Sequence, residues 1–425
     1  MSAFHQLLVL GNGFDLECGL ASTFADFELP RLGSLEHAGG NPGLPEQEGQ
    51  GQSQATPSGQ DDATFYLDAR GITVWDLILR EYRKERSWFD VESTMGDWLE
   101  PSSPHLGPLF QAAQECSTAK EGARAAVNLD RTRNLSEFLS LDIDEQVAIM
   151  LVDTDGWDGK SRPALFDCLM DQTHRFEQEF TRYLMDQVKS NNRYLKKCRR
   201  LITNLVNDRL PDPDSLRPWE DKPEKIEYDE NGKQFKGHPE DVSILDFNYT
   251  SPLAGLRDCP SITNIHGNLL DRNIIFGIDG SDLRATDPDY TDTVKFTKTF
   301  RLMALRQNNN TTIIHPHIDG QPGEETAIIK FYGHSLGPAD YSYFQSLFDT
   351  VDLYASQTRL IFYYNELQGG NSDPERGHMI AEEMYEKVNQ LMTRYGETLD
   401  NENHGRNLLH KLLLEGRLSV APSPR

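Results

Sequence analysis

Short apolar segments that end in glycine or polar turns recur along this chain. The first spans residues 7–10, where a continuous apolar run is typical of a strand buried on both faces of a sheet. The turn Gly11-Asn12-Gly13 follows directly, and apolar residues then recur at helical spacing over residues 16–27. This pattern predicts a strand, a tight turn and a helix in succession.

The same alternation returns in the second half of the chain. We predict further strands at residues 242–246, 262–265, 273–276, 327–331 and 360–364. Helical patterns follow at residues 340–348 and 374–396. Strands interleaved with helices favour parallel pairing under covering helices. We therefore predict an α/β fold, Rossmann-like, with a mostly parallel sheet and a large helical insertion.

The insertion is expected between these two regions, because helical periodicity dominates from about residue 71 to 207. Its clearest helices are predicted at residues 164–189 and 191–207. The second of these carries a run of basic residues on its outer side. Such a run is most often a solvated face, with contact to a partner or a phosphate as the alternative.

Composition suggests where the chain divides. Residues 35–62 are rich in Gly, Gln, Pro and Ser, and they contain too few apolar groups to offset the entropy of ordering. We predict a disordered insertion loop there. The other predicted parts are a Rossmann-like nucleotide-binding core (1–34 and 236–370), a helical insertion (63–235) and C-terminal helices packing on the core (371–425).

Charge and cysteine content narrow the classes of function. The formal net charge is −25 and the pI is about 4.8, which argues against a broad nucleic-acid or anionic-membrane footprint. The five cysteines are scattered without a C-x-x-C pair, so neither a disulfide framework nor a thiolate zinc site is indicated. No signal peptide or membrane-length apolar run is evident. We expect a soluble, cytoplasmic protein without a metal site.

The first turn has two interpretations. Two glycines before a helix can bring backbone N–H groups close to an anion, such as a nucleotide pyrophosphate. The same residues can form an ordinary strand-to-helix turn. Leu16 occupies the third glycine position of the G-x-G-x-x-G fingerprint, so the turn alone leaves both interpretations open.

Polar residues follow four of the predicted strands, in the segments GNGFD, FNYT, IHGN and GHSLGPAD. In open α/β sheets, ligands bind outside the carboxyl ends of the strands. We therefore expect these side chains to converge on one crevice: Asn12, Asp15, Asn248, His266, Ser335 and Asp340. A single such residue is usually a turn or cap residue, but four strand ends with the same feature favour a shared site.

These segments also resemble a known family. Several segments are similar, in the same order, to the blocks of AbiH-type phage abortive-infection proteins. They are GNGFDL with residues 19–27, the segment 88–92, FNYT, IHG with IFG after it, and FYGHSLG with Asp340. The resemblance covers most of residues 5–365. The chain departs from the family pattern at Cys18, where a His commonly stands, and in the 35–62 insertion. The resemblance implies a role in phage defence.

A more remote resemblance is to sirtuin-like NAD-consuming domains of phage defence. It implies cleavage of NAD or a related nucleotide at the ribose–nicotinamide bond, with NAD as substrate and no cofactor required. Asn248 would orient water or ribose, and His266 would be the base, with His334 as its rival. The implied nucleotide-binding residues are Gly11, Asn12, Gly13, Asp15, Gly333, His334, Ser335 and Asp340.

Other functions stay open at this point. The first is a nucleotide-binding sensor or signalling module without catalysis. A nuclease is opposed by the acidic composition and by the lack of an H-x-x-x-H pair, and a purely structural protein leaves the polar strand ends unexplained. The expected partner is a nucleotide ligand, with neither a membrane nor a nucleic acid. The sequence does not identify the phage trigger or decide whether the protein forms a homo-oligomer.

Overall fold

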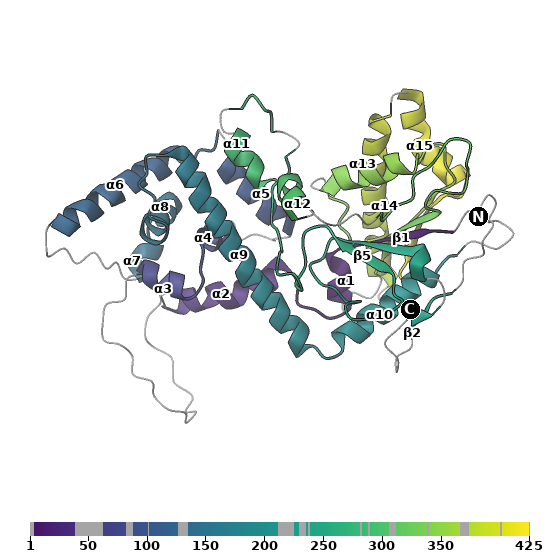
Figure 1. The fold of residues 1–425 in the computed structure, drawn as a ribbon, viewed down its shortest axis with the longest axis horizontal. Helices are drawn as coiled ribbons and strands as arrows, with labels where there is room; N and C mark the ends of the chain where they lie inside the picture. The colour runs from purple at the N-terminus through teal and green to yellow at the C-terminus, as the bar shows by residue number, and fades with distance from the viewer. Residues whose placement is uncertain are drawn as a thin grey trace. The chain divides into compact units, whose positions relative to one another are not determined.

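A computed structural model of the 425-residue chain is shown in Figure 1. It describes residues 4–38, 63–81, 88–100, 102–125, 135–210, 225–228, 235–236, 239–280, 283–287, 290–305, 312–337, 340–365, 374–399 and 402–424. The chain forms two compact units. Unit 1 comprises Met1–Ser22, Leu184–Ile274 and Leu302–Arg425, and unit 2 comprises Thr23–Tyr183 and Ile275–Arg301.

Unit 1 contains a six-stranded sheet in which each strand pairs in parallel with its neighbours. The strands are β1 (Gln6–Leu10), β4 (Val242–Asp246), β5 (Ser261–Asn264), β6 (Ile328–Tyr332), β7 (Arg359–Tyr364) and β8 (Leu418–Pro422). Their spatial order is β5-β4-β1-β6-β7-β8. Counted along the chain, this is third, second, first, fourth, fifth and sixth, the order of a doubly wound Rossmann fold. The predicted fold class is confirmed.

The central position of β1 explains its apolar sequence. Leu10 lies opposite Asp246 of β4 on one side and opposite Tyr332 of β6 on the other. All five residues of β1 are buried. Strand order reverses between β1 and β6, and the carboxyl ends of these two strands are where a doubly wound sheet offers a ligand crevice.

One face of the sheet packs against α13 (Tyr341–Thr350), α14 (Pro374–Glu397) and α15 (Glu402–Leu414). Figure 1 shows α14 and α15 side by side in yellow. Strands and helices contribute together to the core on this face, which includes Leu7, Val9, Ile329, Phe331, Phe344, Phe348, Phe362, Leu391 and Leu408. The rings of Phe331 and Phe362 stack across β6 and β7 with their centroids 4.5 Å apart.

The opposite face carries α1 (Asn12–Glu17) and α10 (Tyr194–Asn207). Because side chains alternate along a strand, Lys330 and Tyr332 of β6 point away from the core described above. Phe14 of α1 packs edge-on against Tyr332. The ammonium group of Lys330 donates to carbonyl oxygens at the end of α10, including those of Leu205 at 2.9 Å and Val206 at 2.7 Å. A small antiparallel ribbon of β2 (Glu227–Tyr228) and β3 (Phe235–Lys236) also belongs to unit 1.

Unit 2 is helical. Its helices are α2 (Phe24–Ala38), α3 (Ala63–Ala69), α4 (Val74–Glu81), α5 (Trp88–Leu99), α6 (Leu106–Ala125), α7 (Leu135–Leu139), α8 (Ile143–Thr154), α9 (Arg162–Ser190), α11 (Tyr290–Thr293) and α12 (Lys298–Leu305), the last residues of α9 and α12 belonging to unit 1. The predicted helices 164–189 and 191–207 are confirmed as α9 and α10. Among the described helices of both units, none has the length and apolar character needed to cross a membrane.

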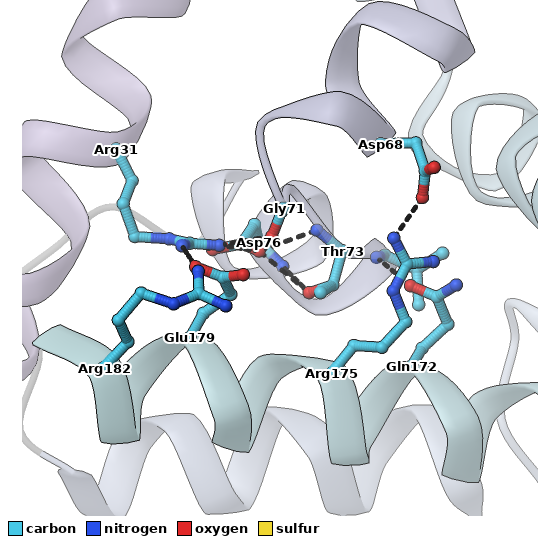
Figure 2. Close-up of polar contacts among 10 residues, drawn as sticks. Arg31, Asp68, Gly71, Thr73, Asp76, Gln172, Arg175, Glu179 and Arg182 are labelled. Carbon is cyan, nitrogen blue, oxygen red and sulfur yellow. Dashed lines mark hydrogen bonds and ion pairs between the residues drawn. The ribbon is translucent and has the colours of Figure 1, made fainter.

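A polar network joins α2, α4 and α9 inside unit 2 (Figure 2). The guanidinium group of Arg31 donates to both carboxylate oxygens of Asp76, to Glu179 at 3.2 Å and to the carbonyl oxygen of Gly71 at 2.8 Å. Asp76 also accepts the backbone N–H and the hydroxyl of Thr73. These hydrogen bonds and ion pairs compensate the charge of the nearly buried Arg31, because a charged group is stable among packed helices only when it is paired and hydrogen-bonded.

Glu177 holds the second segment of unit 2 against α9. Its carboxylate accepts the backbone N–H of Phe276 at 2.7 Å and pairs with both terminal nitrogens of Arg301. Lys298, in the same segment, pairs with Glu92 of α5 at 2.8 Å. Residues far apart in sequence are therefore joined by buried ion pairs.

The structure differs from the predicted elements at two places. Residues 273–276, predicted as a strand, are not in a strand, because Phe276 packs its side chain between Phe176 and Phe180 of α9. Residues 418–422 form β8, which was not predicted. The predicted disordered loop 35–62 lies outside the described residues, apart from residues 35–38 at the end of α2.

Candidate functional site

The glycine turns after β1 and β6 pack directly against each other. Gly11 donates its N–H to the carbonyl oxygen of Tyr332 at 2.9 Å, and Gly13 donates to that of Gly333 at 2.8 Å. A Cβ atom on Gly13 would lie 2.8 Å from the Cα atom of Gly333, which itself has a φ of +68°. These glycines therefore permit close backbone contact, and the amides of Gly11 and Gly13 are used within the protein.

Asn12 and Ser335 lie in these turns but interact with nearby residues. The Oδ1 atom of Asn12 accepts the hydroxyl of Ser22 at 2.6 Å. Ser335 is exposed, and its hydroxyl oxygen accepts the N–H of Gly337 at 3.4 Å. Of the two residues, Ser335 is the more exposed, and Asn12 is partly buried.

Asn248 connects the end of β4 to the first glycine turn. Its side-chain amide donates to the carbonyl oxygen of Gly11 at 3.0 Å, and its backbone N–H donates to Asp246 at 2.9 Å. The side chain of Asn248 therefore contacts the backbone of the turn that contains Asn12. The amide nitrogen of Asn248 is used for positioning the turn.

Asp15 is buried behind the turn. It accepts the hydroxyl of Tyr194 at 2.6 Å and that of Thr250 at 3.1 Å, so it joins α1, α10 and the segment after β4. Burial raises the pKa of Asp15 to about 7, although both hydrogen bonds oppose the shift. Burial, together with the nearby charge of Asp15, also raises the pKa of Asp246 well above its usual value.

Two histidines face the two oxygens of one carboxylate. The Nε2 atom of His266, after β5, lies 4.0 Å from Oδ1 of Asp340, and the Nε2 atom of His334, after β6, lies 3.4 Å from Oδ2. Asp340 immediately precedes α13. The histidines are only 6% and 8% exposed. We call these three residues the His-Asp-His cluster.

The hydrogen bonds of His334 define its tautomer. Its Nδ1 atom accepts the backbone N–H of Leu336 at 2.9 Å, and a backbone N–H can only donate. The proton of a neutral His334 ring is therefore on Nε2, which faces Asp340. Both ring nitrogens of His334 therefore face partners within the protein, Leu336 and Asp340.

Aromatic rings surround the cluster. Phe247 packs edge-on against His334 with the ring centroids 4.4 Å apart, and Phe344 lies on the same imidazole at 4.9 Å. Tyr249 and Tyr343 lie 6.5 Å and 6.1 Å from the ring of His266, and both are partly exposed. Planar apolar rings beside polar groups are typical of sites that bind small organic ligands.

Tyr194, Phe247 and Tyr343 were not among the predicted residues of this region. Phe247 and Tyr249 flank Asn248 in the FNYT segment, which was a usable signal. Tyr194 gave no signal, because its contact with Asp15 spans 179 residues of sequence. Within the described residues, no group of three or more His, Cys, Asp or Glu side chains is arranged to hold a metal ion.

A family model described as bacteriophage abortive infection AbiH matches residues 7–364, a range that contains every residue of the site described above. Neither a curated protein nor a solved structure matches the chain.

Proposed function

The chain belongs to the AbiH family of bacteriophage abortive-infection proteins, and from this premise we propose that unit 1 binds a nucleotide at the carboxyl edge of its sheet and hydrolyses it. The family assigns the chain a role in phage abortive infection. The nucleotide chemistry is our proposal, and it depends on the geometry of unit 1.

The observation that carries the proposal is the His-Asp-His cluster. A carboxylate beside an imidazole keeps the ring oriented and stabilises the imidazolium that forms when the ring takes a proton. His266 and His334 approach the two oxygens of Asp340 from the ends of two different strands. The cluster lies among the carboxyl-end segments of the sheet, where doubly wound folds bind nucleotides.

We assign the base to His266. His334 has its Nδ1 atom occupied by Leu336 and its Nε2 proton directed at Asp340, so it serves to position that carboxylate. The separation of 4.0 Å between His266 and Asp340 exceeds a hydrogen bond but still favours a positive charge on the imidazole. Asn248 holds the Gly11 turn and is a positioning residue in this proposal.

The reaction we propose is hydrolysis of the ribose–nicotinamide bond of NAD. The C1′–N bond breaks and its electron pair returns to the positively charged ring nitrogen, so nicotinamide leaves without a general acid. Water forms the new C1′–O bond and gives its proton to His266. The oxocarbenium-like transition state is the same as in other ribosyl and glycosyl hydrolyses. Tyr249 and Tyr343 would contact the nicotinamide ring, and Ser335 a ribose hydroxyl.

The test is nicotinamide release from NAD by the purified full-length chain. We expect His266→Ala to lower turnover at least 100-fold, the usual effect of removing a general base, with little change in thermal stability. His410→Ala is the matched control, because His410 is exposed on α15. Equal turnover by His266→Ala and the control would contradict the assignment.

A nucleotide sensor without catalysis is the second candidate. It is favoured by the internal hydrogen bonds of Asn12, Asn248 and the glycine amides, which leave few groups at this edge for reaction chemistry. Calorimetry distinguishes the two functions. Binding of NAD with no nicotinamide released over hours would favour the sensor.

A further inference from the structure

Four basic side chains form a stripe along the outer side of α10. Arg193, Lys196, Lys197 and Arg200 are all exposed. Lys196, Lys197 and Arg200 follow Arg193 by three, four and seven residues, and this spacing places all four on one side of the helix. At a rise of about 1.5 Å per residue, the stripe is about 10 Å long. We refer to these four residues as the α10 stripe.

The stripe contrasts with the composition of the whole chain, which has 67 Asp and Glu against 42 Lys and Arg. Residues 187–207 contain six Lys or Arg and no acidic residue. Among the described residues, no carboxylate lies within ion-pair distance of Arg193, Lys197 or Arg200. By comparison, Lys189 pairs with Asp186 at 3.7 Å and Lys387 with Glu383 at 2.5 Å. Arg193, Lys197 and Arg200 therefore present positive charge that the described carboxylates do not pair.

The opposite side of α10 is held firmly in unit 1. Its buried residues are Tyr194, Cys198, Ile202, Leu205 and Val206. Lys330 holds the carbonyl groups at its C-terminal end, and Asn191, just before the helix, donates to the carbonyl oxygen of Gly19 at 2.8 Å. The backbone that carries the stripe is therefore already ordered, so a partner would have only side chains left to immobilise.

We propose that the α10 stripe binds the phosphate backbone of a short stretch of single-stranded nucleic acid. Neighbouring cations at helical spacing have Cβ atoms about 5–6 Å apart, which suits successive phosphates of an extended strand. Arg193 and Arg200 each offer the planar guanidinium fork that binds phosphate oxygens in pairs.

The overall charge limits the length of strand that can bind. A net charge of −25 repels a long polyanion and opposes a broad duplex footprint. A local stripe can still engage a few phosphates at short range, because screening at physiological salt reduces repulsion beyond about 8 Å. An acidic protein surface is a poorer match, since its carboxylates lack the regular spacing of a phosphate backbone.

The experiment measures binding of a fluorescent single-stranded DNA of about 12 nucleotides, and of the same sequence as RNA, by anisotropy. The full-length chain is compared with Arg193→Gln/Lys197→Gln. The matched control, Lys189→Gln/Lys387→Gln, removes the same charge from lysines that already pair with carboxylates. Circular dichroism checks that each variant keeps its helix content.

We expect the logarithm of the wild-type affinity to fall with the logarithm of salt concentration at a slope of about −2, as for three phosphates neutralised on a single strand. The stripe variant should bind at least about tenfold more weakly at low salt, with a slope near −1, and the control should match wild type. Equal binding by the stripe variant overturns the proposal. So does an absence of binding by wild type at about 50 mM salt, or a stripe that binds only a poly-glutamate peptide or a second copy of the chain.

Discussion

The hydroxyl group of Tyr194 donates a 2.6 Å hydrogen bond to the buried carboxyl group of Asp15. This contact joins α10 to α1, the helix that begins directly after the first glycine turn. Because burial raises the pKa of Asp15 from 3.8 to about 7, against the effect of this hydrogen bond, the buried carboxyl group makes the stability of unit 1 depend on pH.

Asp15→Asn tests this dependence. Between pH 3.8 and about 7 the folded state keeps the Asp15 proton while the unfolded state has lost it. The free-energy cost of burying the ionised Asp15 carboxylate is therefore fully present above pH 7, and it decreases as the pH falls toward 4. We expect urea denaturation to show wild type gaining stability relative to Asp15→Asn over that range. If the difference in unfolding free energy between the two proteins stayed constant from pH 4 to 7, Asp15 would have an ordinary pKa.

Gly333→Ala tests the packing of the two glycine turns. Gly333 has a φ of +68°, and an added Cβ would lie 2.4 Å from the backbone nitrogen of Phe14. The left-handed backbone alone costs about 1–2 kcal/mol for alanine, and the clash adds to this. We expect a loss of more than 2 kcal/mol in chemical denaturation. Gly337→Ala is the control, since its Cβ would meet only Ser335 Oγ at 3.4 Å; equal losses in both variants would exclude a special requirement at Gly333.

Glu177→Ala tests the ion pair that holds the second segment of unit 2. Removing the carboxylate leaves Arg301 as a buried cation, a change that typically costs about 3–5 kcal/mol. Phe276 also loses the acceptor for its backbone N–H. We expect a large decrease in the melting temperature and faster proteolysis within residues 275–301. Asp186→Asn, at an exposed position of α9, should leave both unchanged; a small effect of Glu177→Ala would mean that packing alone holds the segment.

The hydrophobic pattern predicted the sheet well where strands are central. The segments 7–10 and 242–246 became β1 and β4, and both strands are buried along their whole length, as expected for strands covered on both faces of a sheet. The segment 273–276 is also largely apolar, but it packs on α9. The apolar pattern of a short segment does not show whether it packs on a helix or pairs in a sheet. Strand β8 lies at the edge of the sheet and contains Pro422, so it has little strand signal of its own.

The sequence indicated candidate residues after particular strands, but it did not give the contacts that these residues make. Polar residues after strands led to Asn248, His266 and Asp340, because parallel strands end at one edge of a sheet. Their roles depend on contacts that spacing does not encode. The backbone N–H of Leu336 donates to Nδ1 of His334 and so defines the tautomer of that histidine. The side-chain amide of Asn248 donates to the carbonyl oxygen of Gly11. The glycines, expected as phosphate ligands, bond to each other's turns.

The most direct test of the proposed chemistry is the NAD content of phage-infected cells that express the chain or its His266→Ala variant at equal levels. We predict that NAD falls during infection in cells with the wild-type chain, with nicotinamide rising in step, and stays constant with the variant. Abortive infection by the wild-type chain with NAD unchanged would contradict the proposal.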